Sequence, residues 1–508
     1  MLGGRKYLWI FLILWGGCQL GIEPAQGVRW ETLPPDHWAY AEIRWLQALG
    51  YLRDLNPSHK PYTRGEIADG LQSSPRSTTG PAQGRFQLLE EEFSPEMIRT
   101  EGWELFTGVR VFTGMEAAHG QEGREAGYGV LNVAVGNPRL GIFTALRADR
   151  DLAECETYKG KIWSECAGLT EQAYAVAFGH NRRWEVKMGR DHRYWGPGDD
   201  HLLLNYGARG LDQISVRVRW TWGEFTALVG QLDDYEDSTG VRTSRFLSGH
   251  RLELIPWEQL RIGISETLLF SGDVRLGSMN PFLPYYGELV NENSEGNGLI
   301  GLDVVAYPHP GLEAFGELLL DDIQVEKKEP ADLEPTEWGW LVGLRWAGWG
   351  GLLGAGISYC GVTNRTYNAV EPRYRYTNYG LPLGSQLGND GDKLRLEMAC
   401  WPDARLRFNP FWEFRRQGEG RVSAEFDTSY AFYTVDEGYR EPFPTGVVEK
   451  AHTLGLWVSA LPHRFIQFEG WIGYNWVEDA EHVSEQTEEG FRGRATLNVR
   501  FDHLNLFP

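Results

Sequence analysis

Apolar and polar side chains alternate along many short stretches of the chain between residue 103 and the C-terminus. In one of them, Ile214, Val216 and Val218 alternate with Ser215 and Arg217. A period of two residues is that of a β-strand, in which successive side chains point to opposite faces. Eight short turns and nine longer, more polar segments separate these stretches in strict alternation, which predicts eighteen antiparallel strands.

Alternation alone is typical of both a soluble sandwich and a transmembrane barrel, so the lengths of the connections decide between them. Outer-membrane barrels join their strands by short periplasmic turns and long outer loops. The sequence therefore predicts an all-β transmembrane barrel of about 18 antiparallel strands over residues 102–508, with both of its ends on the periplasmic side. In a barrel the row of Ile214, Val216 and Trp220 faces lipid, whereas a sandwich would bury this row between its two sheets.

Residues 28–101 follow a different pattern, with apolar side chains at helical spacing. A first helix is predicted over 39–52, with Asp36 as its N-cap. Thr63 and Glu66 have the three-residue offset of a capping box at the start of a second helix. A third helix follows a linker rich in Ser, Pro, Thr and Gly. We therefore expect a small helical module in the periplasm.

The first 27 residues have the pattern of a secretory signal peptide, in which two basic residues precede an apolar run and small residues follow. Cys18 leaves open a lipoprotein cleavage instead. Cys155 and Cys166 bracket a polar segment and are candidates for a disulfide in an oxidising envelope.

The composition changes this picture little. The 508 residues include 21 Trp, 22 Tyr, 23 Phe and 62 Gly, and after the signal no run of 18 apolar residues predicts a transmembrane helix. A net charge of −21 argues against nucleic acid as a partner, because phosphate neutralisation requires Lys and Arg. No GxSxG, HExxH or phosphate-binding glycine loop occurs, so we predict no enzyme and no cofactor or metal site.

The run RDHRYWGPGDDHLLLNYGARGLDQI, which begins at Arg190, resembles the signature segment of the Wzi-like capsule-assembly family of outer-membrane β-barrels. Three later segments, Asn280–Val304, Tyr307–Gln324 and Asn378–Asp392, also resemble the family. The resemblance implies a barrel preceded by a periplasmic helical bundle. It also implies a non-catalytic role in capsule or exopolysaccharide assembly, with outer-membrane lipid and the polysaccharide as partners.

Residues 28–101 also resemble a single S-layer-homology repeat, which implies peptidoglycan as a further partner. Plain packing of short helices beneath the barrel is the alternative that we favour. For the whole chain, a porin or saccharide channel, a cell-wall-tethering barrel and an envelope glycoside hydrolase or lyase remain open as other functions.

Two long segments carry the candidate residues for polysaccharide binding or for a plug in the lumen. In Arg190–Asp212, Trp195 could stack on a sugar ring; the alternative that we favour is a plug whose charges pair with lumen residues such as Arg217 or Arg219. In Ser271–Asn297, tyrosines, amides and carboxylates fit sugar recognition, and a solvated acidic loop is the alternative. The candidates are Arg190, Asp191, Arg193, Trp195, Asp199, Asn205, Arg209, Tyr285, Tyr286, Glu288, Asn291 and Glu292.

Overall fold

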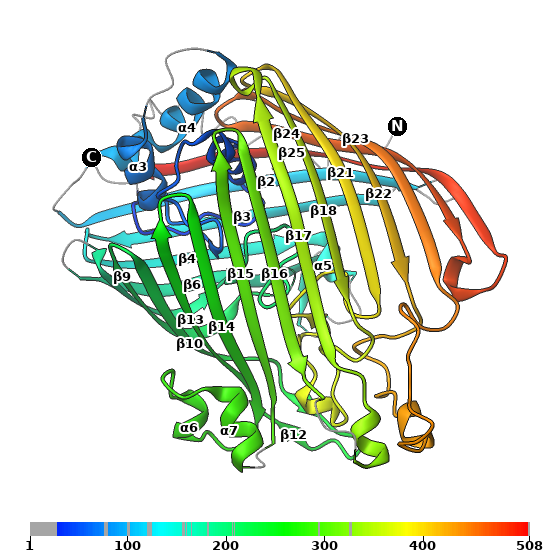
Figure 1. The fold of residues 1–508 in the computed structure, drawn as a ribbon. Coiled ribbons are helices and arrows are strands. Elements are labelled where there is room, and N and C mark those ends of the chain that lie inside the picture. Colours follow the sequence, from blue (N-terminus) through cyan, green and yellow to red (C-terminus); the bar gives the residue numbers. More distant parts are fainter. Residues whose placement is uncertain are drawn as a thin grey trace.

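The computed structural model describes residues 28–75, 80–98, 102–118, 124–154, 158, 160–163, 165–179, 182–205, 207, 209–292, 295–324 and 328–505. The predicted signal peptide, Cys18 and Cys155 lie outside these residues. The described strands form a closed antiparallel barrel, in which β25 pairs with β2 and places Val499 opposite Val111 (Figure 1). The prediction of eighteen long strands is confirmed.

These strands are β2 (Glu104–Ala118), β3 (Arg124–Gly136), β4 (Leu140–Asp149), β6 (Cys166–Phe178), β7 (Trp184–Asp191), β9 (Leu211–Trp220), β10 (Gly223–Gln231), β13 (Arg245–Trp257), β14 (Leu260–Ser271), β15 (Asn297–His309), β16 (Leu312–Asp322), β17 (Glu337–Gly348), β18 (Leu353–Val362), β21 (Gly391–Asp403), β22 (Leu406–Gln417), β23 (Glu449–His463), β24 (Ile466–Glu478) and β25 (Thr487–Asn505).

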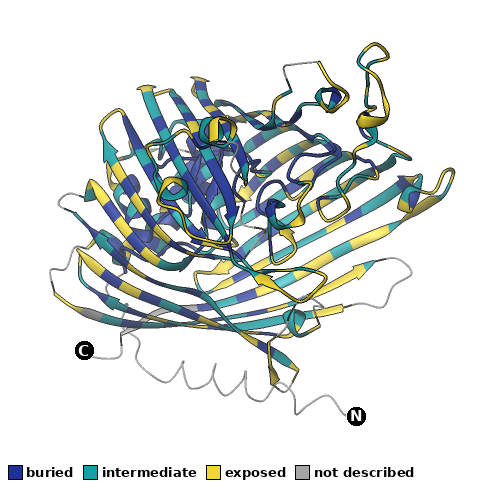
Figure 2. Ribbon diagram, turned by 90° about the horizontal axis from the view of Figure 1, so that it is seen from below, coloured by how far each residue is buried: buried dark blue, intermediate teal, exposed yellow. Residues whose placement is uncertain are grey.

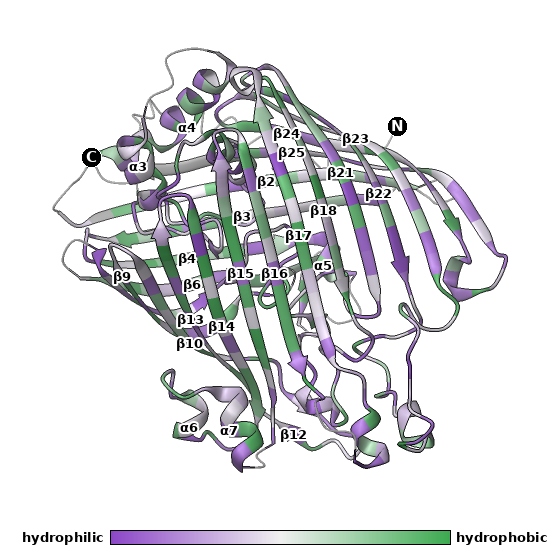
Figure 3. Ribbon diagram, in the orientation of Figure 1, coloured by the Kyte–Doolittle hydropathy of each residue, from purple (hydrophilic) through white to green (hydrophobic). Residues whose placement is uncertain are grey.

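Along the strands, apolar side chains point outward and polar side chains point into the lumen. On β9, Ile214 is 52% exposed and Val216 is 39% exposed, whereas Ser215 and Arg217, which alternate with them, are buried. Burial and hydropathy alternate in the same way along other strands (Figures 2 and 3). The predicted orientation is confirmed, because a sandwich would have buried the Ile214 row. Among the described residues no helix is both long and apolar enough to cross a bilayer.

The short and long connections alternate as predicted, but several boundaries differ from the prediction. The polar residues of 114–126 predict a long irregular connection, but most of them lie within β2 and β3, which pair as far as Glu116 opposite Arg124. Likewise Pro256 and Trp257 predict a turn, but β13 continues through Trp257. The backbone ladder continues beyond the apolar band, so hydropathy marks the extent of the band rather than that of the strand.

The N-terminal module (28–98) contains β1 (His59–Lys60) and the helices α2 (Ala39–Leu49), α3 (Arg64–Ser73) and α4 (Pro81–Met97). The predicted capping box at Thr63 and Glu66 is present. The predicted N-cap at Asp36 is wrong, because Trp38 occupies that position without a side-chain cap. Asp36 instead pairs with Arg110 at 3.2 Å and accepts a hydrogen bond from Tyr128, since a guanidinium on the barrel wall is a stronger partner than a backbone amide.

The N-terminal module enters the short-turn end of the barrel, where α3 and α4 are seen in Figure 1. Glu42 on α2 accepts hydrogen bonds from Arg407 at 2.8 Å and from the indole of Trp401. The carbonyl of Ala48 accepts a hydrogen bond from the amide of Gly311 in the β15–β16 turn. The module is therefore built into the mouth of the lumen.

The remaining elements belong to connections. They are α5 (Arg150–Ala153), β5 (Ile162–Trp163), β8 (Tyr194–Trp195), β11 (Tyr235–Glu236), β12 (Arg242–Thr243), α6 (Leu276–Met279), α7 (Tyr285–Glu292), η2 (Pro330–Leu333), η3 (Trp349–Gly351), η4 (Pro372–Tyr374), β19 (Thr377–Asn378), β20 (Leu381–Pro382), η5 (Ser429–Phe432) and η6 (Ala480–His482). Of these, η3 lies in a short turn, between β17 and β18.

Candidate functional site

The described residues of 192–210, here called the plug segment, leave β7 and pack inside the lumen. Trp195 is only 2% exposed and belongs to a large apolar cluster with Leu202, Leu203 and Leu204. Its strand β8 pairs with β1 of the N-terminal module, so that Trp195 lies opposite His59. This burial removes Trp195 from the candidates for stacking on a sugar at the surface.

The charged residues at the start of the plug segment are bonded within the lumen. Asp191, at the end of β7, is fully buried and accepts hydrogen bonds from Lys187 and Gln172, both at 2.7 Å. Arg193 is also buried, and its guanidinium donates to the hydroxyl of Ser215 and approaches the ring of His59, both at 3.1 Å. These residues act as structural contacts.

The predicted lumen partners of the plug, Arg217 and Arg219, are engaged elsewhere. Arg217 pairs with Glu224 at 2.7 Å and with Glu66 of α3 at 2.9 Å, and Arg219 also contacts Glu66. That part of the prediction is wrong, because the N-terminal module brings its own carboxylate to these arginines.

The Gly-Pro-Gly turn is fixed by one lumen-facing carboxylate. Glu317 on β16 accepts hydrogen bonds from the amides of Gly198 at 3.2 Å and Leu202 at 2.9 Å. Gly196 has a φ of +123°, and a Cβ at this position would overlap the Glu317 carboxylate. Only glycine fits both the left-handed backbone and this close approach.

A second loop, residues 363–390, here called the capping loop, covers the plug from the long-loop end. Tyr376 donates a hydrogen bond to the carbonyl of Leu203 at 3.0 Å, and the amide of Asn205 donates one to the carbonyl of Leu383 at 2.7 Å. Arg245, which faces inward from β13, donates to the carbonyl of Arg373 at 2.8 Å. The plug segment and the capping loop are thus interlocked.

Three other predicted residues lie in or beside this assembly. Arg190 forms a paired contact with Asp212, with its Nε 2.9 Å from one carboxylate oxygen. Asp199 pairs with Arg44 of α2. Arg209 lies over the ring of Tyr379, 4.6 Å from its centroid.

The second group of predicted residues lies on helix α7 rather than in a loop, and its members are Tyr285, Tyr286, Glu288, Asn291 and Glu292. The helix packs against outward-facing side chains of the wall, where the ring of buried Tyr285 lies 4.7 Å from that of His250. Tyr286 donates a hydrogen bond to Asp322, whereas Asn291 and Glu292 are exposed. This group and the plug segment are not brought together into one site.

The sequence analysis missed an exposed group of rings in the connection between β22 and β23. Phe432 is 87% exposed and Tyr433 is 45% exposed, and the ring of Tyr433 lies 5.2 Å from that of Tyr439. With Tyr430, they form what is here called the aromatic cluster, near η5 at the long-loop end (orange in Figure 1). The run YAFY within a long polar segment was the available signal.

Buried Arg365 of the capping loop anchors this connection. It pairs with Glu441 at 2.6 Å, donates to the carbonyl of Asp427 at 2.6 Å and lies 5.2 Å from the ring centroid of Tyr430. The hydroxyl of Tyr439 forms a hydrogen bond with Ser429 at 2.9 Å. Exposed rings beside fixed carboxylates and a guanidinium can stack on a flat apolar face and hydrogen-bond to hydroxyls.

An apolar outer face, a polar inner face against which loops pack, and long loops at one end define this protein as an outer-membrane β-barrel. The chain belongs to the capsule assembly protein Wzi family, whose sequence profile matches residues 168–490. The resemblance predicted from the sequence is therefore confirmed.

Among solved structures, the chain is similar to one described as Wzi, an outer membrane protein involved in group 1 capsule assembly in Escherichia coli and a carbohydrate-binding β-barrel. The TM-score is 0.61 at 16% identity, over 92% of this chain and 99% of that chain. OccD3 of Pseudomonas aeruginosa matches with a TM-score of 0.46 at 13% identity, over 80% of this chain and 92% of that one. No curated protein matches the sequence significantly.

Proposed function

We propose that this protein is a non-catalytic outer-membrane component of capsule or exopolysaccharide assembly, which binds the polysaccharide at the cell surface. The observation that carries the proposal is the aromatic cluster, which presents exposed rings at the long-loop end of a barrel of this family. The plug segment and capping loop fill the lumen beneath it, which favours surface binding over a porin or channel.

Binding at this surface combines stacking with hydrogen bonds from groups that are already held in place. Phe432 and Tyr433 offer ring faces to the apolar side of a sugar, and Glu441 and Asp427 offer acceptors to its hydroxyl groups. Because Arg365 holds both carboxylates before the ligand arrives, little loop ordering opposes association.

The placement of the chain in the envelope follows from the same proposal. Both ends of the barrel lie on the short-turn side, which we place in the periplasm together with residues 28–101. Residues 1–27 act as the secretion signal. The extensive contacts of the N-terminal module with the barrel wall favour packing over tethering to peptidoglycan as its main role.

The test compares retention of polysaccharide on cells that carry the native protein or the variant Phe432→Ser/Tyr433→Ser. We expect the variant to retain roughly thirtyfold less, because two exposed rings contribute about 1 kcal/mol each at such a surface. Phe282→Ser is the matched control, since this ring is also exposed but packs beside the outer wall, 5.9 Å from Phe225. Equal retention by all three, at equal amounts of folded barrel, contradicts the proposal.

A further inference from the structure

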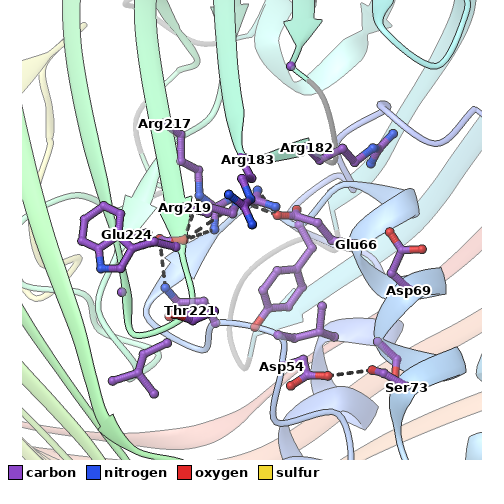
Figure 4. A pocket seen from close by; sticks show the side chains of 18 of the residues that line it. Asp54, Glu66, Asp69, Ser73, Arg182, Arg183, Arg217, Arg219, Thr221 and Glu224 are labelled. Carbon is purple, nitrogen blue, oxygen red and sulfur yellow. Dashed lines mark hydrogen bonds and ion pairs between the residues drawn. The ribbon is translucent and has the colours of Figure 1, made fainter.

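A cavity of about 960 Å³ lies at the short-turn end, between α3 and the turns of the barrel wall (Figure 4). It is remote from the aromatic cluster, at the opposite end of the barrel. Seven arginines and four carboxylates line it, so that positive side chains outnumber negative ones by three. We call it the arginine cavity. Its volume is in the range of ligand pockets and leaves room for several sugar rings.

Three of its arginines form no ion pair with a carboxylate of the described residues: Arg139, Arg182 and Arg183. Arg139 and Arg183 are exposed in the β3–β4 and β6–β7 turns, at the mouth of the cavity. Figure 4 shows Arg182 and Arg183 among the side chains that line the cavity. In a protein with a net charge of −21, such a gathering of unpaired guanidinium groups is unexpected.

Arg182 is the strongest indication of a ligand. Among the described residues its Nη2 is buried and has no hydrogen-bond partner, although the carboxylates of Asp69 and Glu66 are close enough to attract its charge. The guanidinium also donates a long bond of 3.5 Å to the carbonyl of Arg29 and lies over the ring of Phe178. Burial and the nearby Arg29 lower the pKa of Arg182 to about 10, so that the side chain remains charged at neutral pH. A buried charged donor without a partner is costly unless an anion occupies the site.

The remaining lining favours a saccharide over a small inorganic anion. Asp54 accepts a hydrogen bond from Ser73 at 2.6 Å and has no ion pair among the described residues. A carboxylate acceptor among the arginines suits a ligand that carries hydroxyl groups beside its negative charge, as an acidic saccharide does.

We propose that the arginine cavity binds a carboxylate-bearing segment of an acidic polysaccharide from the short-turn side, with Arg139, Arg182 and Arg183 contacting its carboxylates. The proposal rests on the proposed function, and it names the class of saccharide and a second contact at the opposite end of the barrel.

The test is calorimetric titration of the full-length protein in detergent with a tetrasaccharide of alternating glucuronate and N-acetylglucosamine. We expect the variant Arg139→Gln/Arg182→Gln/Arg183→Gln to bind at least about tenfold more weakly, since each charge-assisted hydrogen bond lost is worth about that factor. Because these arginines form no ion pairs with the described residues, we expect their replacement to leave the fold intact, which heat-modifiable migration on gels checks. Arg464→Gln is the matched control, an exposed arginine in the β23–β24 turn at the same end.

Two further ligands sharpen the outcome. The same tetrasaccharide with its carboxyl groups reduced to alcohols should bind at least about tenfold more weakly to the native protein. Pyrophosphate is the second ligand. The proposal is overturned if both tetrasaccharides bind equally well, or if the triple variant binds the acidic tetrasaccharide as tightly as the native protein does. It is also overturned if pyrophosphate binds and the acidic tetrasaccharide does not, or if neither ligand binds. Phe432→Ser/Tyr433→Ser should not change this titration, so failure of surface retention and failure of the arginine cavity are separate results.

Discussion

At the short-turn end the N-terminal module holds the barrel wall through ion pairs, such as Glu42 with Arg407 and Glu66 with Arg217, beside apolar contacts such as that of Trp45 with Trp401. At the long-loop end the plug segment and the capping loop pack inside the lumen through leucine and tyrosine side chains and through hydrogen bonds to backbone carbonyls. A buried ion pair is destabilised when either charged partner is removed, whereas an apolar cluster is destabilised when side-chain volume is lost. The two halves should therefore fail in different ways when they are disturbed.

The largest effect is expected in the apolar half, from Trp195→Ala. Removing a side chain that is 2% exposed leaves a cavity in the main cluster, which should lower the free energy of unfolding by about 3–5 kcal/mol. Conductance in planar bilayers should rise as the plug segment loosens. Trp163→Ala, at an exposed ring, is the control. A native-like unfolding midpoint for Trp195→Ala would show that the cluster does not hold the plug.

A smaller loss is expected in the charged half, from Glu42→Gln. The change removes the partner of Arg407 and of buried Arg85, and we expect a loss of about 2–3 kcal/mol, because glutamine keeps one acceptor. Limited proteolysis should then cleave the N-terminal module while the barrel stays closed. Glu91→Gln is the control, since its pair with Arg405 is exposed and worth about 0–1 kcal/mol. Equal protection of both variants contradicts the assignment of the module's anchoring to ion pairs.

The contact between the plug segment and the wall is tested by Gly196→Ala. This change strains a left-handed backbone and forces the new Cβ against Glu317, for about 1–3 kcal/mol of lost stability in thermal unfolding. Gly240→Ala matches it, because Gly240 has a φ of +83° but open space around it. The difference between the two variants measures the contact with Glu317, and identical losses would show that this contact is unimportant.

The strand pattern was predictable because the wall obeys a simple rule: lipid outside, polar groups inside, and a side-chain period of two. The plug segment was recognisable from its glycine turn and its leucines. Its partners were not, since the pairing of Asp191 with Lys187 and the engagement of Arg217 by Glu66 depend on which segments the closed barrel brings together. Helix α7 was missed because its polar residues face solvent while Tyr285 packs on a wall that its local sequence does not reveal.

The smallest effect is expected from a change of pH, which should destabilise the N-terminal module but not the plug segment. His37 is buried in the N-terminal module, and its Nδ1 accepts a hydrogen bond from the amide of Ala39, which requires an unprotonated nitrogen. Burial, and then the charge of Arg500, lower its pKa to about 4, below the 6.5 of an unfolded histidine. Between these two values the unfolded chain binds the proton more tightly, so stability falls as the pH drops below about 6.5. At pH 5.5 the loss should be about 1 kcal/mol, seen as faster proteolysis of the N-terminal module but not of the plug segment. His37→Gln should remove this part of the acid sensitivity, and a variant that retains it in full would place the titrating group elsewhere.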